Sequence, residues 1–367
     1  MHSLANLIVK ELRSYLRDPR TRAILVGPPL LQLFVFSFAA TLEVRNVDIA
    51  VLDDDAGRWS HELVARIAAA DLVDDVKTVV STEQLRALID RREVLLGVRF
   101  PSDFSRAVEA GEGATAQVLI DGRRANAGQV AFSYLNSIAG GFGAELAQQA
   151  TGQTAPAAAV RHWFNPNLEY RWFIVPSLSG MLSMMLALLV TALSIARERE
   201  LGTFDQLLVT PAGPLEIIIG KTVPALVIGA LVGSIMVAAG ILFFRIPFTG
   251  SLALLMGCML LFILSVVGLG LTISSFCKTQ QQAILGVFAV TVPIVLISGF
   301  ATPVENMPAW LQVVSEASPL KHFLLIVQGS FLKALPAAEV ASHAWPLAVI
   351  ATVTLVAATL VVKGRLQ

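Results

Sequence analysis

Three groups of residues have types and spacings that could do chemistry, and the first is similar to a phosphate-binding loop. Gly220-Lys221-Thr222 matches the end of the P-loop pattern GxxxxGK[ST]. That pattern needs a glycine at position 215, where this sequence has Leu215, and no strand precedes the triplet. Because a long apolar stretch follows directly, we interpret the triplet as a small residue and a cation at the start of a helix. The sequence therefore predicts no nucleotide site in this chain.

The second group is the acidic run Asp53–Asp55, whose D-x-D spacing suits a divalent cation. It directly follows a predicted edge strand, and we favour a solvated acidic turn over a metal site. His61 and His162 are far apart, and Cys258 and Cys277 lie in or beside apolar stretches, so neither a paired-ligand site nor a disulfide framework is indicated. No GxGxxG follows the strand. We predict no catalytic residue and no metal site.

The third group is the polar stretch 197–221, RERELGTFDQLLVTPAGPLEIIIGK. Charges of both signs come first, and Gly202-Thr203 can end a helix. A short amphipathic turn, 204–209, is stopped by two X-Pro pairs. Pro214 can then open the next helix. A short stiff helix of this kind would suit transmission of motion from a soluble partner, and an ordinary interfacial loop explains the spacing equally well.

The elements that would position these groups are mostly apolar. Of the 367 residues, 55% are hydrophobic and 15% are charged, whereas about 25% are charged in a typical soluble domain. Residues 43–171 hold 31 of the 54 charged side chains. One third of the chain thus looks like a soluble domain and the rest like a membrane protein. This excludes a wholly soluble enzyme, a disordered protein and a nucleic-acid binder with a basic face.

Six stretches are long enough to cross a membrane as helices. A span needs about 20 apolar residues, and none of the six contains Asp, Glu, Lys, Arg or His. Four prolines interrupt residues 302–343, which we predict to be an external loop with a short helix. The sequence predicts an α-helical polytopic membrane protein with six transmembrane helices, at 23–42, 172–196, 222–244, 251–275, 281–301 and 344–362.

Lysine and arginine near the span ends predict the orientation, because they concentrate in cytoplasmic loops. Eleven fall on one side of the predicted spans and three on the other. Both termini are therefore predicted to be cytoplasmic, with residues 43–171 outside. The eleven are Lys10, Arg13, Arg17, Arg20, Arg22, Arg197, Arg199, Lys221, Lys278, Lys363 and Arg365, and the three are Arg245, Lys321 and Lys333.

Residues 1–22 are predicted to form a cytoplasmic amphipathic helix that leads into span one. Within 3–17, apolar residues fall largely on one helical face and basic residues on the other, as in a helix lying on a membrane surface. A cleavable signal peptide would have an apolar core of about 7–15 residues, whereas this one has about 20. We therefore favour a retained span. The apolar face comprises Leu4, Leu7, Ile8, Leu12, Tyr15 and Leu16.

Residues 43–171 are predicted to form an α/β domain inserted between spans one and two. Apolar runs typical of strands alternate with helical patterns, which favours a small α/β fold. The strands are expected at 47–52, 75–80, 94–100 and 116–120, and the helices at 59–70, 82–91, 101–110 and 126–150. We predict a binding or gating element rather than an enzyme.

The predicted spans contain no ionisable side chain, whereas ion-coupled transporters usually keep such residues in the membrane for proton or sodium relays. Any transport must then draw its energy from another polypeptide. Phe34, Phe36 and Phe38 in span one could line the path of an apolar or amphipathic substrate, or face lipid or a partner subunit. Gly229 and Gly233 form GxxxG, which indicates either a close helix contact or chance.

Three stretches of the sequence resemble the ABC-2-type permeases, the membrane subunits of one class of ABC transporter. Residues 197–221 resemble the family's signature. Residues 268–283, GLGLTISSFCKTQQQA, resemble the end of its fourth span. Residues 298–333 resemble its external segment between spans five and six. A large external domain between spans one and two resembles the exporter branch often linked to drug efflux.

This resemblance implies a half-transporter in the inner membrane of a bacterium, in which two permease subunits, identical or paralogous, pair with two cytoplasmic ATPase subunits. The chain itself would bind no cofactor, since ATP and Mg would be used by the ATPase. Membrane lipid and export partners in the envelope are further expected partners, and nucleic acid is not. Residues 3–17 would be the connecting helix and 203–211 the coupling helix. The coupling residues implied are Thr203, Phe204, Asp205, Leu207, Leu208, Thr210 and Pro211.

Two other functions fit the sequence less well. A membrane-anchored ligand-binding or sensing protein would need far fewer spans than six. A membrane enzyme acting on lipid would need an acid/base pair at the membrane surface, and we identify none. The predicted organisation is therefore an N-terminal amphipathic helix at 1–22, span one at 23–42, the external α/β domain at 43–171 and spans two to six at 172–367. The last of these includes the coupling loop at 197–221 and the external loop at 302–343.

Overall fold

The computed structural model describes residues 2–17, 19–39, 46–151, 163–165, 169–203 and 213–366. The chain divides into two compact units. One is helical and combines Met1–Ala40 with His162–Gln367, and the other is the intervening Thr41–Arg161, which contains the sheet.

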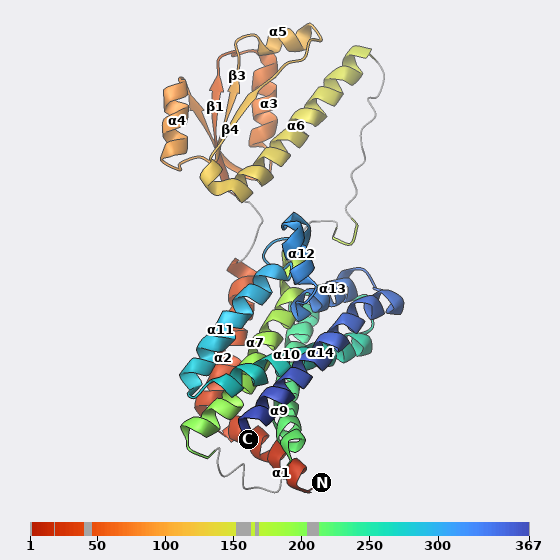
Figure 1. Ribbon diagram of the computed structural model, residues 1–367. Coiled ribbons are helices and arrows are strands. Elements are labelled where there is room, and N and C mark those ends of the chain that lie inside the picture. Colours follow the sequence, from red (N-terminus) through yellow and green to blue (C-terminus); the bar gives the residue numbers. More distant parts are fainter. Residues whose placement is uncertain are drawn as a thin grey trace. The chain divides into compact units, whose positions relative to one another are not determined.

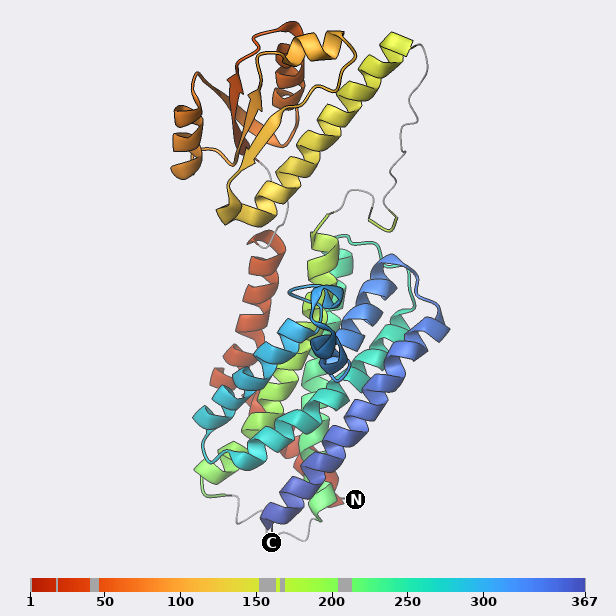
Figure 2. The same cartoon turned by 45° about the horizontal axis from the view of Figure 1, so that its top comes forward.

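The helical unit consists of helices that run side by side (Figures 1 and 2). Five described helices are long and apolar enough to cross a membrane, with 18 to 30 residues each, as a core about 30 Å thick requires. The long helices are α2 (Pro19–Ala39), α7 (Arg171–Glu200), α9 (Pro214–Leu242), α10 (Leu252–Phe276), α11 (Gln280–Ile297) and α14 (Ala337–Leu366), and α1 (His2–Arg17) precedes them.

Two predictions about the helical unit need adjustment. The first predicted span coincides with α2, whose apolar stretch in the described residues is the shorter Gly27–Phe36, so the count of six stays a prediction. Residues 302–343 contain not one short helix but two, α12 (Ala309–Ser315) and α13 (Pro319–Leu332), with the turn η2 (Val304–Asn306) before them and the start of α14 at the end. Proline starts α13 at its first turn, where its missing N–H costs nothing.

The centre of the helical unit is α7, which packs against α2, α9, α10, α11 and α13. Phe262 of α10 stacks on Phe323 of α13 with ring centroids 4.4 Å apart. Small residues allow close helix contacts. A side chain on Gly233 would meet Met259 of α10 and Ser183 of α7, so the predicted GxxxG of α9 makes close contacts within this chain.

The α/β unit contains the four predicted strands and four predicted helices. The sheet order is β2 (Val73–Val79), β1 (Val47–Asp53), β3 (Leu96–Phe100) and β4 (Gln117–Ile120). β1 pairs in parallel with β2 and β3, and β4 is antiparallel to β3. The helices are α3 (Arg58–Ala68), α4 (Thr82–Asp90), α5 (Phe104–Glu109) and α6 (Ala125–Thr151), with the turn η1 (Gly122–Arg124) before α6.

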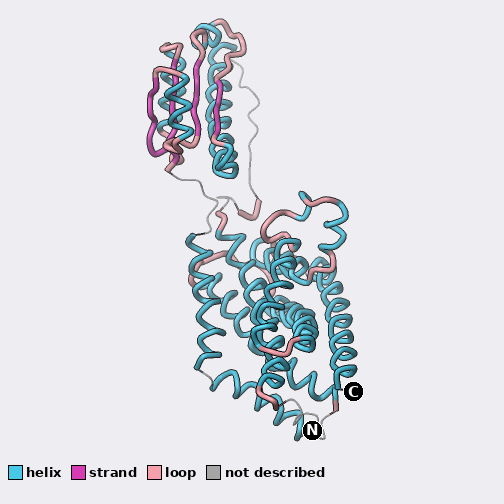
Figure 3. Tube along the Cα trace, turned by 60° about the vertical axis from the view of Figure 1, so that its left-hand side comes forward, coloured by secondary structure: helices cyan, strands magenta, loops and turns pink. Residues whose placement is uncertain are grey.

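Helices cover both faces of this sheet (Figure 3). Ile49 and Val51 of β1 share a core with α3, α5 and α6. Ala50 and Leu52 point to the other face and pack with Leu85 of α4. A strand buried on both faces reads as a continuous apolar run, which is why IAVL, residues 49–52, stands out in the sequence.

Candidate functional site

Several helix ends meet at one end of the helical unit. α1, the last turn of α7, the first turns of α9 and the C-terminal end of α14 lie there (Figures 1 and 2). The predicted coupling loop leaves α7 and returns at α9 on this side. We take this end as the candidate functional site, because its charged side chains connect helices that are far apart in the sequence.

The last turn of α7 is closed by a glycine cap. Gly202 has a φ of +69°, a left-handed conformation that glycine adopts without steric cost. The Thr203 amide donates to the Glu198 carbonyl at 2.9 Å, and the Gly202 amide donates to the Arg199 carbonyl at 3.1 Å. These are the two bonds of a Schellman motif. The predicted helix stop at Gly202-Thr203 is confirmed.

A buried ion cluster joins α7 to α9 and α1. The side chain of Lys221 is 0% exposed, and its Nζ lies 3.1 Å from Oε2 of Glu198 and 3.4 Å from Oε1 of Glu11. Nζ also donates to the Ser194 carbonyl at 3.2 Å. Lys10, which is 63% exposed, lies 3.7 Å from Glu198. Two cations thus face two carboxylates, so the cluster carries no net formal charge.

The same contacts explain the P-loop-like triplet. Gly220 lies beneath Leu7 of α1, and a side chain on Gly220 would collide with Leu7. Glycine therefore allows α1 to approach, and the next residue, Lys221, reaches Glu11 one turn further along α1. The interpretation of Gly220-Lys221 as a small residue and a cation is supported. Its position at a span end needs correction, because α9 begins at Pro214 and Lys221 lies about 10 Å along the helix.

The prediction that the spans contain no ionisable side chain also needs correction. Leu215–Leu242 is one of the helices apolar enough to cross a membrane, and it includes Lys221. The cost of burying a charge is several kcal/mol per ion. It is offset here because carboxylates from two other helices surround the ammonium group.

The neighbouring charges of α7 connect it to α10 and α11. Arg199 donates to the Ser275 carbonyl at 2.8 Å and to the Cys277 carbonyl at 3.3 Å, which satisfies carbonyls at the end of α10. Glu200 accepts from the amide of Gln280 at 2.6 Å, in the first turn of α11, where the helix dipole favours a carboxylate. Three successive residues of α7 therefore hold four other helices.

The predicted coupling residues are only partly described. Thr203 is exposed, and its hydroxyl donates to the Glu198 carbonyl at 3.3 Å. Phe204, Asp205, Leu207, Leu208, Thr210 and Pro211 lie outside the described residues. The second flank agrees with expectation, since Pro214 opens α9 and Glu216 lies in its first turn.

The three phenylalanines of the proposed substrate path do not share one environment. Phe34 of α2 is 62% exposed, whereas Phe36 is partly buried against the core of the helical unit. The side chain of Phe38 lies outside the described residues. The substrate path stays a prediction.

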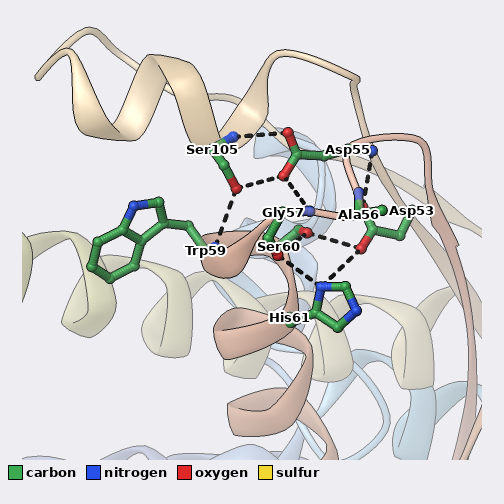
Figure 4. A network of polar contacts seen from close by, with 8 residues as sticks. All are labelled: Asp53, Asp55, Ala56, Gly57, Trp59, Ser60, His61 and Ser105. Carbon is green, nitrogen blue, oxygen red and sulfur yellow. Dashed lines mark hydrogen bonds and ion pairs between the residues drawn. The ribbon is translucent and has the colours of Figure 1, made fainter.

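The acidic run after β1 is a hydrogen-bonded clamp (Figure 4). Asp53 accepts from the amides of Asp55 and Ala56 and from the Ser60 hydroxyl. Asp55 accepts from the Gly57 amide and from the amide and hydroxyl of Ser105. Within the described ranges, no three His, Cys, Asp or Glu side chains gather as metal ligands. The run is thus bonded to its surroundings, where a merely solvated turn was expected. The strand before it is also not the expected edge strand, because β1 pairs with β2 on one side and β3 on the other.

The clamp also changes the acidity of one carboxyl group. Burial disfavours the Asp55 carboxylate, but the hydrogen bonds from Ser105 and the Gly57 amide outweigh it and lower the pKa of Asp55. The charged form therefore fastens the β1–α3 loop to the start of α5.

The sequence reasoning missed Glu11 as a member of the site. Its signal was present, because Glu11 is the only acidic residue among 2–17 and follows Leu4, Leu7 and Ile8 at helical spacing on the apolar face. An acidic residue on an apolar face indicates a buried cationic partner, which the structure identifies as Lys221.

The fold and this site together define a class of protein: a polytopic membrane protein with its helix ends tied together by charges around one loop. The family comparison then identifies the chain. Residues 22–360 match the model of the ABC-2 family transporter proteins, and the chain belongs to this family. It is a permease subunit of an ABC exporter, and membership of the family implies an ATPase partner.

Curated relatives are similar over nearly the whole chain. The probable multidrug ABC transporter permease YbhR of Escherichia coli K12 is 46% identical over 353 residues, which cover 96% of each protein. The probable multidrug ABC transporter permease YbhS of the same strain is 29% identical, covering 89% of this chain and 87% of YbhS. The inner membrane transport permease YhhJ of Escherichia coli K12 is 27% identical, and the match covers 89% of this chain and 88% of YhhJ.

Proposed function

We propose that the chain is one of two permease subunits of an exporter that moves an apolar or amphipathic substrate, drugs included, out of the cytoplasm. The observation that carries this proposal is the relationship to YbhR, which is named a probable multidrug permease and matches 96% of this chain. The spans agree, because Lys221, which lies in one of them, is buried and paired with carboxylates and does not present its charge to a hydrophilic path.

The proposed topology places both termini and the charged cluster in the cytoplasm of a bacterial cell, with six spans in the inner membrane and the α/β unit outside. Both termini lie at the same end of the helical unit as the charged turn of α7 (Figure 1). Two of the basic residues predicted to be cytoplasmic lie at this end. Arg199 is part of the charged turn of α7, and Lys10 of α1 pairs with Glu198 in that turn. An even number of spans is required for termini on one side.

The proposed energy source is ATP hydrolysis by a separate subunit that contacts the coupling segment, residues 203–211. The flanks of this segment support the role. On one side Gly202 ends α7 abruptly, and on the other Pro214 starts α9. A segment between two fixed helix ends transmits displacement to both helices. ATP and Mg would be held by the partner.

The coupling assignment is tested by substituting Leu207 in the complex reconstituted with its ATPase. Leu207→Asp places a carboxylate on the proposed contact surface, and we expect efflux of an amphipathic fluorescent dye to fall while the complex still hydrolyses ATP. Val80→Asp is the matched control, because Val80 is 82% exposed in the α/β unit and lies outside the candidate spans. Unchanged dye efflux and hydrolysis in an assembled Leu207→Asp complex would show that the assignment is wrong.

The partner assignment is tested by purification in mild detergent. We expect the chain to co-purify with an ATPase that contains a complete P-loop, and with a second permease chain. A chain that binds ligand but recruits no ATPase under conditions that preserve such complexes would contradict the proposal.

A further inference from the structure

Lys221 has no role in the function described so far, although it is among the most buried large side chains of the described residues. Its ammonium group joins three separate segments. Glu11 is 210 positions away in the sequence, and Glu198 is on the other side of the coupling loop. A lysine serving only as a topology signal would lie at a membrane surface with its charge in water.

We propose that Lys221 is a positioning residue for energy coupling, which makes α1, the end of α7 and the start of α9 move as one body. This inference rests on the proposed function, since it assumes that a partner displaces the coupling segment. The ion pair between Glu198 and Lys221 closes the base of the loop. Displacement of the loop is then shared by both flanking helices, and the pair with Glu11 passes it to α1.

The packing around the cluster gives this link one fixed geometry. Leu7 of α1 lies over Gly220, directly before Lys221, so apolar contact and ion pair act on the same turn of α9. The Ser194 carbonyl accepts a hydrogen bond from Nζ at 3.2 Å, which holds the ammonium group against α7. Buried ion pairs are weak evidence for stability but can specify one arrangement over others, as this proposal requires.

Lys10 provides a matched comparison within the same cluster. It also pairs with Glu198, but at 3.7 Å and with 63% of its side chain exposed. An exposed pair of this kind contributes little. If burial and geometry decide the role, neutralising Lys221 must disturb coupling and neutralising Lys10 must not.

The test uses the purified complex with its ATPase, compared without nucleotide and after trapping with ATP and vanadate. Hydrogen–deuterium exchange is measured in residues 2–17 and 213–225. In the wild type we expect trapping to change exchange in both segments together. Lys221→Met removes the buried cation from Glu11 and leaves Glu198 only the exposed Lys10, which threatens folding. The informative variant is therefore the triple change Glu11→Gln, Glu198→Gln and Lys221→Met, which removes every charge of the buried link.

In the triple variant we expect residues 213–225 to respond to trapping while the response of 2–17 falls about two- to thirty-fold, the range in which residues along a coupled network act. Dye transported per ATP hydrolysed should fall as well. Lys221→Arg and Lys10→Met should behave as the wild type.

Two failures can be told apart. An assembled triple variant whose α1 responds as in the wild type overturns the role of Lys221 and leaves the proposed function intact. A wild-type complex in which trapping changes exchange in neither segment overturns the proposed coupling itself, and the role of Lys221 with it.

Discussion

The glycine cap at the end of α7 can be tested by a substitution, Gly202→Ala, that changes the stability of the last helical turn through backbone strain. Gly202 has a φ of +69°, and no atom of the described residues lies within 4 Å of where its Cβ would be. Gly202→Ala therefore introduces no collision with the part of the chain that the structure describes. It introduces only the strain of an L-residue in the left-handed region, at the turn from which Glu198, Arg199 and Glu200 reach the other helices.

The expected magnitude follows from two opposing effects. A left-handed non-glycine residue costs roughly 1–2 kcal/mol. Replacing glycine also removes freedom from the unfolded chain, which offsets about 0.4–1 kcal/mol. The net cost is about 1 kcal/mol, which corresponds to about a five-fold increase in opening of the last turn. The opening breaks the bond from the Thr203 amide to the Glu198 carbonyl.

The assay is hydrogen–deuterium exchange of residues 195–203 in the purified protein. We expect about five-fold faster exchange there for Gly202→Ala, and a smaller increase for Gly202→Asn, because asparagine tolerates the left-handed region. Gly257→Ala is the control, since Gly257 lies inside α10 with open space around its Cβ position and alanine favours a helix. Equal exchange in Gly202→Ala and the wild type would refute the assignment of this cap.

Three further perturbations test other contacts. In Gly268→Ala the new Cβ would lie 2.5 Å from backbone of α14, so we expect a loss of about 1–3 kcal/mol in thermal unfolding, which Gly257→Ala should not show. Glu200→Gln removes the charge that caps α11 at Gln280 and should speed exchange in the first turn of α11 alone. Because the pKa of Asp55 is lowered, its contribution to stability is full above about pH 4 and is lost as the pH falls through its folded-state pKa. Asp55→Asn should therefore make unfolding of the α/β unit less dependent on acid, and equal pH dependence in both proteins would contradict the clamp.

Local patterns explain why so much of the α/β unit could be predicted. The run VDIAVL is apolar apart from Asp48, because β1 pairs with a strand on either side and has helices on both faces. The order and direction of the strands, in contrast, do not follow from local patterns. Whether β4 joins β3 parallel or antiparallel depends on how α5 and the following loop return, and the sequence has no short-range signal for it.

The helix ends show the same contrast. Gly202 and Pro214 act through their own backbone, so the end of α7 and the start of α9 could be placed from residue types alone. The partners of the charges could not. Glu198, Arg199 and Glu200 were visible as a charged run, but each bonds to a helix at least 20 residues away in the sequence. Long-range pairing depends on the packing of the bundle.

The surroundings of Lys221 decide between two chemistries that the sequence leaves side by side. A P-loop lysine must present its ammonium group to phosphate. Here the side chain is 0% exposed and already has two carboxylates within 3.4 Å. A phosphate would have to displace both carboxylates and open the contact between Leu7 and Gly220. The glycine and the lysine thus serve helix packing in this chain, which is the arrangement that the proposed positioning role of Lys221 requires.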